Sequence, residues 1–413
     1  MGLIVAAAAA YVLRNGLVPA WTTMTTDFPN YYVSAKVVAR GEPAARLYHD
    51  GWFAARIKRE GIDQPGRFST FPPATAFVML PLTPLSPTWA RRVWLFIGVG
   101  CLALLVFLAA RLTHAPPLAA ALAPALCAGA LVSNFRLGQL YLVIATLMTA
   151  ALWCAKRDAP RRAGVLLGLG ISVKYFPVVV LPVWWAQKRY SAVFMTLLTC
   201  AAVTLLEWVV FGQDTWWAFV RGVFLPHLDG RIAGQGAGYV TAYQSLHSLC
   251  RNLFLYHAVE NPHPLLPYPA LYTLCKWGTM ALIAGWGARR FFQAGGLAPP
   301  EAESYRTALI SATAMVLLPV TASYHLLLMV PGLTLLLHLA GTHGETRRHA
   351  LLAAGCAGLL GFFPFWRLHA LPTTGWWLLL HYYRLWLLLL LWAVTAALLP
   401  PLLRRRAATS GAG

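Results

Sequence analysis

Carboxylates are scarce in this chain, with 13 Asp and Glu among 413 residues. Asp27 is the most informative of them, because it follows an apolar N-terminal stretch by a few residues, in Thr25-Thr26-Asp27-Phe28-Pro29-Asn30-Tyr31-Tyr32. A carboxylate at a membrane boundary is partly desolvated, which raises its pKa and suits it to act as a general base on a hydroxyl. The alternative is that Asp27 or Thr26 only caps a helix running from Phe28 towards Ala39.

Lys174 is the first candidate for binding a phosphate group. It lies at the outer end of a short glycine-rich apolar segment, where a lysine is costly unless it is paired. Its ammonium could therefore balance the charge of a phosphate leaving group. The alternative is a lysine that extends its side chain to the membrane interface and binds nothing.

Five further side chains carry groups that suit a phosphate or a sugar. His325, Arg251 and Arg91 are candidates for the phosphate. The amides of Gln139 and Gln244 could bind sugar hydroxyls, because an amide both donates and accepts hydrogen bonds. Each has a structural alternative, which is a packed histidine for His325, a helix start at the interface for Arg91 and packing between helices for the two glutamines.

The composition identifies the environment in which these residues work. Hydrophobic residues make up 59% of the chain and charged residues 11%, and the mean hydropathy is +0.60. An average soluble domain carries about 25% charged residues. This composition excludes a disordered chain and argues strongly against a soluble enzyme. The apolar residues occur in long blocks, such as 385–399, so the sequence predicts an all-α polytopic membrane protein.

The basic residues are arranged as expected for such a protein. Lys and Arg number 33, which gives a formal charge of +20. They gather in short clusters between apolar blocks, the pattern of cytoplasmic connectors, and no basic stripe interleaved with aromatic residues suggests nucleic acid binding. The clusters are Lys156–Arg162, Lys188–Arg189, Arg289–Arg290, Arg347–Arg348 and Arg404–Arg406.

If every cluster is placed in the cytoplasm, successive apolar segments cross the plasma membrane in alternating directions, and both termini lie on the cytoplasmic side. The sequence predicts one integral membrane domain over 1–413 with about 12 transmembrane helices. Two outer loops are expected at about 22–90 and 212–266, and a cytoplasmic tail at 404–413. The proline-rich stretch 72–87 is expected not to cross, because proline breaks a spanning helix. A juxtamembrane helix with Tyr31, Ala35 and Val38 on one face is expected to lie along the outer surface, with aromatic anchors.

Neither a disulfide framework nor a metal site is predicted. Six of the seven cysteines lie in apolar stretches, and Cys250 falls in an expected loop without a nearby ligand pattern. No acidic pair or His/Asp/Glu cluster has the spacing of metal ligands. We therefore expect no metal and no cofactor.

Several short motifs resemble, in the same order, those of glycosyltransferase family 87. They extend over most of the chain up to about residue 341, and the tryptophan of the family's last motif is absent. The motifs are Asp27-Phe28-x-x-Tyr31-Tyr32-x-x-Ala35 with Gly41 and Leu47-Tyr48, Phe71-Pro72-Pro73, Gly138-Gln139, Ala163–Gly168 with Lys174 and Pro177, Gln244-Ser245-Leu246 with Arg251, and Leu318-Pro319-Val320 with Ser323, Tyr324 and His325.

The resemblance implies a GT-C-like membrane enzyme that transfers a sugar, typically mannose, from a polyprenyl-phosphate donor on the extracytoplasmic side. It implies Asp27 as the catalytic base of an inverting displacement, with a glycolipid or glycan as acceptor. For the mycobacterial α-1,2-mannosyltransferases of this family the acceptor is a phosphatidylinositol mannoside. Substrate-binding roles would fall to Lys174, His325, Arg251, Gln244, Gln139, Tyr31 and Arg91.

Two other activities fit a polytopic protein of this kind. A secondary transporter or flippase of lipid-linked sugars would need charged groups near the bilayer midplane and paired broken helices. A ligase or polymerase of lipid-linked glycans would usually centre on arginines and a histidine in a large late loop. In all three cases the partners are membrane lipids and lipid-linked sugars, and none is a nucleic acid.

Overall fold

The computed structural model of the chain describes residues 1–25, 27–68, 70–232, 238–341, 344–363, 368 and 370–410. Within these ranges the secondary structure is helical and no β-strand occurs, which confirms the all-α prediction. Thr26, an alternative cap of the first outer helix, lies outside the described residues.

The N-terminal half begins with a nearly continuous apolar helix and includes most of the first outer loop. Its helices are α1 (Gly2–Val12), α2 (Val18–Thr22), α3 (Asp27–Ala39), α4 (Asp50–Arg59), α5 (Thr75–Val78), α6 (Pro87–Thr113), α7 (Pro117–Ala120), α8 (Leu122–Leu126), α9 (Ala128–Leu137), α10 (Tyr141–Lys156), α11 (Pro160–Val173) and α12 (Val180–Ala186).

The C-terminal half contains the second outer loop and the remaining long helices. These are α13 (Tyr190–Phe219), α14 (Leu225–Leu228), α15 (Leu246–Phe254), α16 (Pro269–Gln293), α17 (Pro299–Leu317), α18 (Val330–Gly341), α19 (Arg347–Phe362), α20 (Leu378–His381), α21 (Tyr383–Ala397) and α22 (Leu399–Ser410). Short 3₁₀ or π segments join some of them, among them η1 (Leu13–Leu17), η2 (Ala44–Tyr48), η3 (Leu80–Leu82), η4 (Phe176–Val179), η5 (Val220–Phe224) and η7 (Ser323–Met329).

Five helical stretches in the described residues are long and apolar enough to cross a membrane. They are Gly2–Thr22, Pro87–Thr113, Tyr190–Leu228, Ser323–Gly341 and Tyr383–Ala407. A sixth is possible if Pro117–Leu126 and Ala128–Leu137, bent by 70°, count as one span. The membrane-embedded character is thus supported, while the count of about 12 remains a prediction from hydropathy.

The longest helix shows why these segments need lipid. On α13, Phe194, Leu205 and Val209 are 63%, 64% and 76% exposed. Large apolar side chains in this number cannot remain in water at low cost. The opposite face packs closely on α11, where a Cβ on Gly164 would meet the Ala192 carbonyl oxygen at 2.7 Å and one on Gly168 would meet Thr199 Cβ at 2.6 Å. The glycine-rich segment therefore packs closely on α13.

The segment 22–90, predicted to be the first outer loop, has a hydrophobic core to which Trp94, Leu140 and Phe211 also contribute. Phe28, Tyr31 and Phe53 are fully buried in it, together with Phe68 and Met79. The stretch 72–87 contains only the short α5 and η3 before α6 begins, and neither is long enough to span a membrane. The predicted aromatic anchors are wrong for α3, because Tyr31 and Tyr32 face this protein core instead of lipid.

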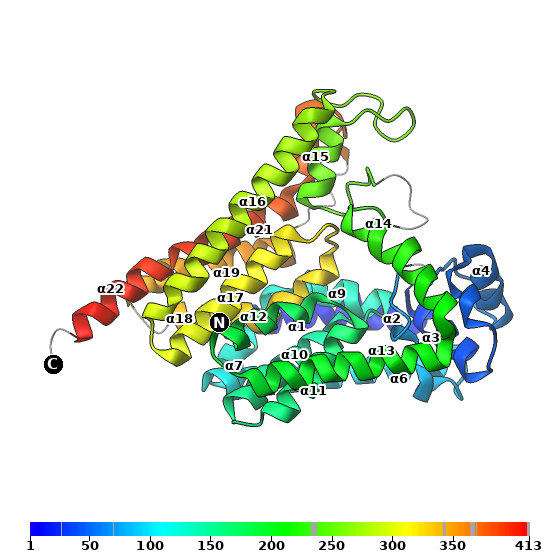
Figure 1. The fold of residues 1–413 in the computed structure, drawn as a ribbon, viewed down its shortest axis with the longest axis horizontal. Coiled ribbons are helices and arrows are strands. Elements are labelled where there is room, and N and C mark those ends of the chain that lie inside the picture. The colour runs from blue at the N-terminus through cyan, green and yellow to red at the C-terminus, as the bar shows by residue number, and fades with distance from the viewer. Residues whose placement is uncertain are drawn as a thin grey trace.

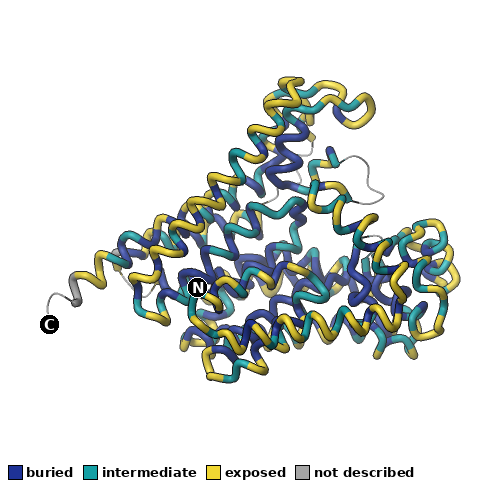
Figure 2. The backbone as a smooth tube through the Cα atoms, viewed as in Figure 1, coloured by how far each residue is buried: buried dark blue, intermediate teal, exposed yellow. Residues whose placement is uncertain are grey.

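Figure 1 shows how the loops and the long helices are arranged. α3 and α4 lie at one end of α6 and α13, while α16, α21 and α22 form a second group of helices that diverges from the first. α14 and α15, from the second outer loop, lie on the side of the molecule where the two groups of helices separate. Figure 2 shows the buried backbone concentrated where α9, α10 and α3 meet, which is where the candidate site is found.

Candidate active site

Asp27 is the first residue of α3 and lies in the first outer loop, directly after α2. Its carboxylate is partly buried by the core of that loop. Burial raises the pKa of the Asp27 carboxyl above its ordinary value, while a hydrogen bond from Gln139 and the positive charge of Lys174 lower it. Because its pKa is raised, the Asp27 carboxylate can accept a proton from an alcohol more readily than a fully solvated carboxylate can.

Gln139 connects Asp27 to the core of the outer loop. Its Nε2 donates to Asp27 Oδ2 at 2.7 Å, and its Oε1 accepts from the Tyr31 hydroxyl at 2.6 Å. Because an ionised carboxylate can only accept, the amide NH₂ must point to Asp27, and the amide oxygen then accepts from the Tyr31 hydroxyl. The second carboxylate oxygen, Oδ1, receives no hydrogen bond within the described part of the chain, so it is available to a substrate hydroxyl.

The turn before Gln139 sets the position of its amide. α9 ends at Gly138, which has φ +72°, and α10 begins at Tyr141. A Cβ at Gly138 would lie 2.7 Å from both Arg91 Nη1 and Phe28 Cβ, so only glycine fits there without displacement. The indole of Trp94 donates to the Gly138 carbonyl at 3.0 Å and holds the turn.

Lys174 follows the last residue of α11, as expected, and its ammonium lies over two aromatic rings. Nζ is 4.6 Å from the ring centre of Phe71 and 5.2 Å from that of Tyr141. Burial lowers the pKa of Lys174 to about 8, and the carboxylate of Asp27 opposes that shift. Phe71, from the aromatic-Pro-Pro motif, also packs against Tyr31 with ring centres 4.7 Å apart, so it links the cation to the Asp27 network.

His325 completes this group through Tyr141. The backbone N–H of Ala322 donates to His325 Nδ1 at 2.9 Å, and Nε2 lies 2.6 Å from the Tyr141 hydroxyl oxygen. Because Nδ1 accepts, a neutral imidazole carries its proton on Nε2 and donates it to Tyr141. The hydroxyl proton of Tyr141 is then free for another acceptor. Tyr324 stacks on Tyr141, with ring centres 5.0 Å apart.

An apolar pocket of about 390 Å³ is lined by residues on either side of Lys174 in the sequence, among them Ser172 and Tyr175. It lies between α11, α13 and the Phe71-Pro72-Pro73 segment. Glu207 closes one end by accepting from the Ala74 backbone N–H at 2.5 Å and from the Trp216 indole at 3.1 Å. The lining residues are Pro72, Pro73, Ile171, Ser172, Tyr175, Cys200, Thr204, Glu207, Trp216, Phe219, Val220 and Phe224.

Arg91 and Gln244 make structural contacts. Arg91 is 2% exposed, and its guanidinium donates to the carbonyls of Phe135 and Arg136 at the end of α9. Gln244 is 1% exposed, and its Oε1 accepts from the Arg384 backbone N–H at 2.7 Å. Both residues hold segments beside the site, and neither contacts Asp27.

Arg251 belongs to a separate group of charges on the second outer loop. Its guanidinium donates to the Asp229 carbonyl at 2.8 Å and lies 3.4 Å from the Asp229 carboxylate. Lys276 and Arg231 lie 3.2 and 3.3 Å from the same carboxylate. The expected loop around Cys250 is helical, because this residue and Arg251 are both within α15.

The tertiary structure adds Tyr141, Tyr324 and Glu207 to the residues selected from the sequence. Tyr141 had a visible signal, since it follows Gly138-Gln139 by two residues at a helix start. Glu207 also had one, as a lone carboxylate in an apolar helix. Among the described residues, no group of three or more His, Cys, Asp or Glu side chains is placed to hold a metal ion.

A family model described as glycosyltransferase family 87 matches residues 70–319, more than half of the chain. The matched range contains Gln139, Lys174 and Glu207. Asp27 precedes it and His325 follows it. No solved structure matches the chain.

Two curated relatives are similar to the chain, and both are described as polyprenol-phosphate-mannose-dependent alpha-(1-2)-phosphatidylinositol mannoside mannosyltransferases. The protein from Mycobacterium tuberculosis is 28% identical over 223 residues, which are 54% of this chain and 45% of the relative. The protein from Mycolicibacterium smegmatis is 28% identical over 276 residues, which are 66% of this chain and 53% of the relative. The chain thus matches about half the length of each relative.

Proposed function

The chain belongs to glycosyltransferase family 87, and on that premise we propose that it is a membrane mannosyltransferase that uses a polyprenyl-phosphate sugar as donor. The acceptor would be a glycolipid or glycan hydroxyl, as the names of the two relatives suggest for phosphatidylinositol mannosides. The observation that supports this most directly is the joint placement of a partly buried carboxylate, Asp27, and a cation over aromatic rings, Lys174, around Tyr141.

Asp27 acts in this proposal as the general base. The acceptor hydroxyl binds to Oδ1, and its oxygen attacks the anomeric carbon while its proton passes to the carboxylate. The bond between the anomeric carbon and the phosphate oxygen breaks, and its electron pair leaves with the phosphate. A single displacement inverts the anomeric centre, so a β-linked donor gives an α-linked product. Gln139 fixes the carboxylate through Oδ2 during this step.

Lys174 and Tyr141 meet the charge that develops on the leaving phosphate. The ammonium supplies a full positive charge at a site with little water, where electrostatic stabilisation is strong. Tyr141 donates the hydroxyl proton that His325 leaves unused. His325 is therefore a positioning residue in this arrangement, and so are Tyr31, which holds Gln139, and Arg91, which holds the end of α9.

The apolar pocket beside Lys174 suits the first isoprene units of the donor. It opens next to the proposed phosphate position, and its walls are mainly apolar. A prenyl chain buried there gains about 25 cal/mol for each Å² of apolar surface removed from water. The site would lie on the extracytoplasmic side of a plasma membrane, because the basic connectors are expected on the opposite side.

The test compares purified wild-type protein with Asp27→Asn in the transfer of labelled mannose from polyprenyl-phosphate mannose to a glycolipid extract. We expect turnover to fall by roughly 10²–10⁴-fold, the usual contribution of a general base. Thermal stability in detergent should be unchanged or higher, because the buried carboxylate is lost. Full activity of Asp27→Asn, or uptake of a lipid-linked sugar into proteoliposomes without a glycosylated product, would contradict the proposal.

A further inference from the structure

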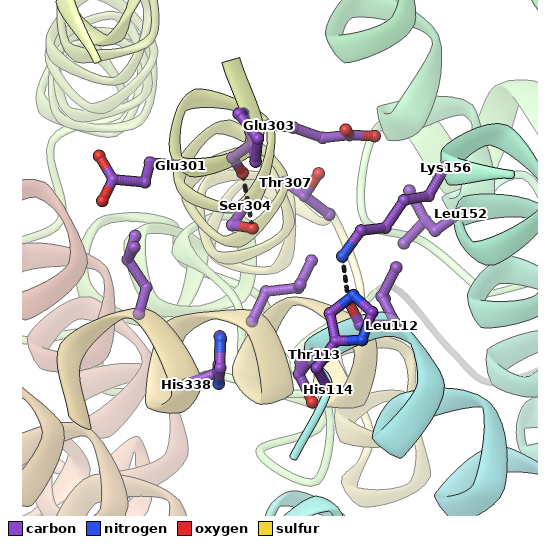
Figure 3. A pocket seen from close by; sticks show the side chains of 13 residues that line it. Leu112, Thr113, His114, Leu152, Lys156, Glu301, Glu303, Ser304, Thr307 and His338 are labelled. Carbon is purple, nitrogen blue, oxygen red and sulfur yellow. Dashed lines mark hydrogen bonds between the residues drawn. The ribbon is translucent and has the colours of Figure 1, made fainter. Parts of the chain in front are cut away.

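A second pocket lies at the end of α10 that is remote from the candidate active site. It has a volume of about 270 Å³ and lies among the ends of α6, α10, α17 and α18 (Figure 3). Tyr141 and Lys156 are the first and last residues of α10, so they are about 22 Å apart at the helical rise of about 1.5 Å per residue. The pocket therefore has no contact with Asp27 and adjoins the basic connector that is expected in the cytoplasm.

Lys156 provides the main cation of this pocket. Its Nζ donates to the Leu112 carbonyl at 2.8 Å, which uses one of its three N–H bonds. Two donors are left for a ligand. Glu301 and Glu303 also line the pocket, and each lies beside an arginine, with Arg405 3.5 Å from Glu301 and Arg189 3.1 Å from Glu303. Among the described residues Lys156 makes no ion pair within 4.0 Å, although its positive charge also acts on Glu303.

Thr307, on α17, lines the pocket with a hydroxyl group that has no hydrogen-bond partner in the described structure. The residue is fully buried. Threonines elsewhere in these helices bond back to the preceding turn, as Thr313 does to the Leu309 carbonyl at 2.8 Å. Figure 3 shows Thr307 and Ser304 facing the same space as Lys156 and His114. A buried hydroxyl without a partner costs free energy that a ligand oxygen would recover.

A groove lined by apolar side chains together with Arg111 and His114 continues from this pocket along α6. The groove has a volume of about 520 Å³ and shares His114 with the pocket. Ala103, Val106 and Ala110 form its apolar floor, and the Arg111 guanidinium lies over the Phe107 ring at 5.1 Å. A polar pocket with an unpaired cation, followed by an apolar groove on a membrane-facing helix, matches the shape of a phospholipid with its headgroup and one chain.

We propose that Lys156, His114 and Thr307 bind the phosphate of an anionic membrane phospholipid, and that one acyl chain of this lipid lies in the groove along α6. Charge complementarity selects an anionic lipid, because the cations Lys156, Arg189 and Arg405 outnumber the carboxylates Glu301 and Glu303 around the pocket, and Arg111 adds a positive charge in the groove. Basic pockets between membrane helices on the cytoplasmic side are suited to such headgroups. The site is independent of the proposed transfer reaction.

The experiment measures lipid retention by native mass spectrometry on the full chain in detergent, after exchange into phosphatidylglycerol or phosphatidylcholine. We expect wild type to retain phosphatidylglycerol about tenfold better than phosphatidylcholine, and Lys156→Met to lose that preference. Arg157→Met is the matched control, since it removes a cation one residue away that does not line the pocket. Equal retention of both lipids by wild type, or an unchanged preference in Lys156→Met, would overturn the proposal.

Two further measurements in this experiment distinguish binding of a whole lipid from binding of a free phosphate, and they exclude misfolding as the cause of a loss. Ala103→Trp fills the groove from an exposed position, so it should lower phosphatidylglycerol retention about threefold or more while the melting temperature stays the same. Glycerol phosphate at an equal concentration should not displace the lipid, because it lacks the chain. Displacement by glycerol phosphate, or normal retention by Ala103→Trp, would show that the groove holds no acyl chain.

Discussion

The contact between Gln139 and Asp27 gives the most informative test of the candidate site. In Gln139→Leu the carboxylate loses the N–H that it accepts at 2.7 Å, while the size of the side chain is nearly kept. The same change removes the acceptor of the Tyr31 hydroxyl, which is fully buried. The variant therefore has two separable effects, one on the pKa of Asp27 and one on the free energy of unfolding.

The size of each effect follows from the two hydrogen bonds. A hydrogen bond to a charged group contributes about 1.5–3 kcal/mol, and one pKa unit corresponds to about 1.36 kcal/mol. The bond from Gln139 lowers the pKa of Asp27, so its loss should raise that pKa further. Leaving the Tyr31 hydroxyl unsatisfied should cost about 1–3 kcal/mol of stability.

The assay is the pH dependence of kcat/KM for mannose transfer from about pH 4 to about pH 9. A general base works only when deprotonated, so activity rises with pH through the pKa of Asp27. In Gln139→Leu this acid limb should move to higher pH, with the activity at high pH largely kept. Tyr31→Phe is the control, because it breaks the bond to Gln139 and leaves the bond from Gln139 to Asp27 in place, so its acid limb should move less than that of Gln139→Leu. An unmoved acid limb in Gln139→Leu would refute the assignment of Asp27 as the base.

Three other predictions concern the cation, the turn and the second outer loop. Because the pKa of Lys174 is lowered to about 8, kcat/KM for the donor should fall above that pH as the ammonium loses its proton. Lys174→Arg should remove this fall from the measured pH range, because an arginine stays charged, and Lys174→Met should lower activity at every pH. If the fall persists in Lys174→Arg, it belongs to another group. Gly138→Ala should reduce kcat about tenfold or more by displacing the turn that holds the amide beside the base. Its control Gly41→Ala, at φ +64° with nothing within 4 Å of its Cβ, should affect only stability, and equal kcat values would refute this reasoning. In thermal unfolding, Asp229→Asn should lower Tm more than Lys276→Met, because it leaves buried cations unpaired, and the reverse order would contradict that view.

The candidate site was only partly accessible to sequence reasoning. Asp27 and Lys174 could be selected because a charged group next to lipid is costly and therefore informative wherever it occurs. The structure brings these two residues around Tyr141, together with Gln139 and His325. Their catalytic roles are still predictions.

The outcome for other residues depends on packing that the sequence does not contain. The aromatic face of α3 is predicted to be a membrane anchor, but its tyrosines fill a core formed with the rest of the first loop. Arg91 and Gln244 each bond to backbone groups, while Nε and Nη1 of Arg91 have no partner in the described structure, and the ligand-binding roles of both residues stay predictions. Arg251 follows its motif as expected but joins Asp229 in a separate charge cluster. A side chain's chemistry shows what it could bind, and only its neighbours decide what it does bind.

The sequence by itself determined that the chain is helical and built for lipid, because composition and hydrophobic periodicity act locally and need no knowledge of partners. It also determined which scarce charges are informative. The tertiary structure alone decided which of them meet, since the bonds that build the site join Asp27 to Gln139 across 112 positions and Tyr141 to His325 across 184. Such contacts depend on how helices and outer loops pack together, and the free energy of that packing is spread over residues distant in sequence.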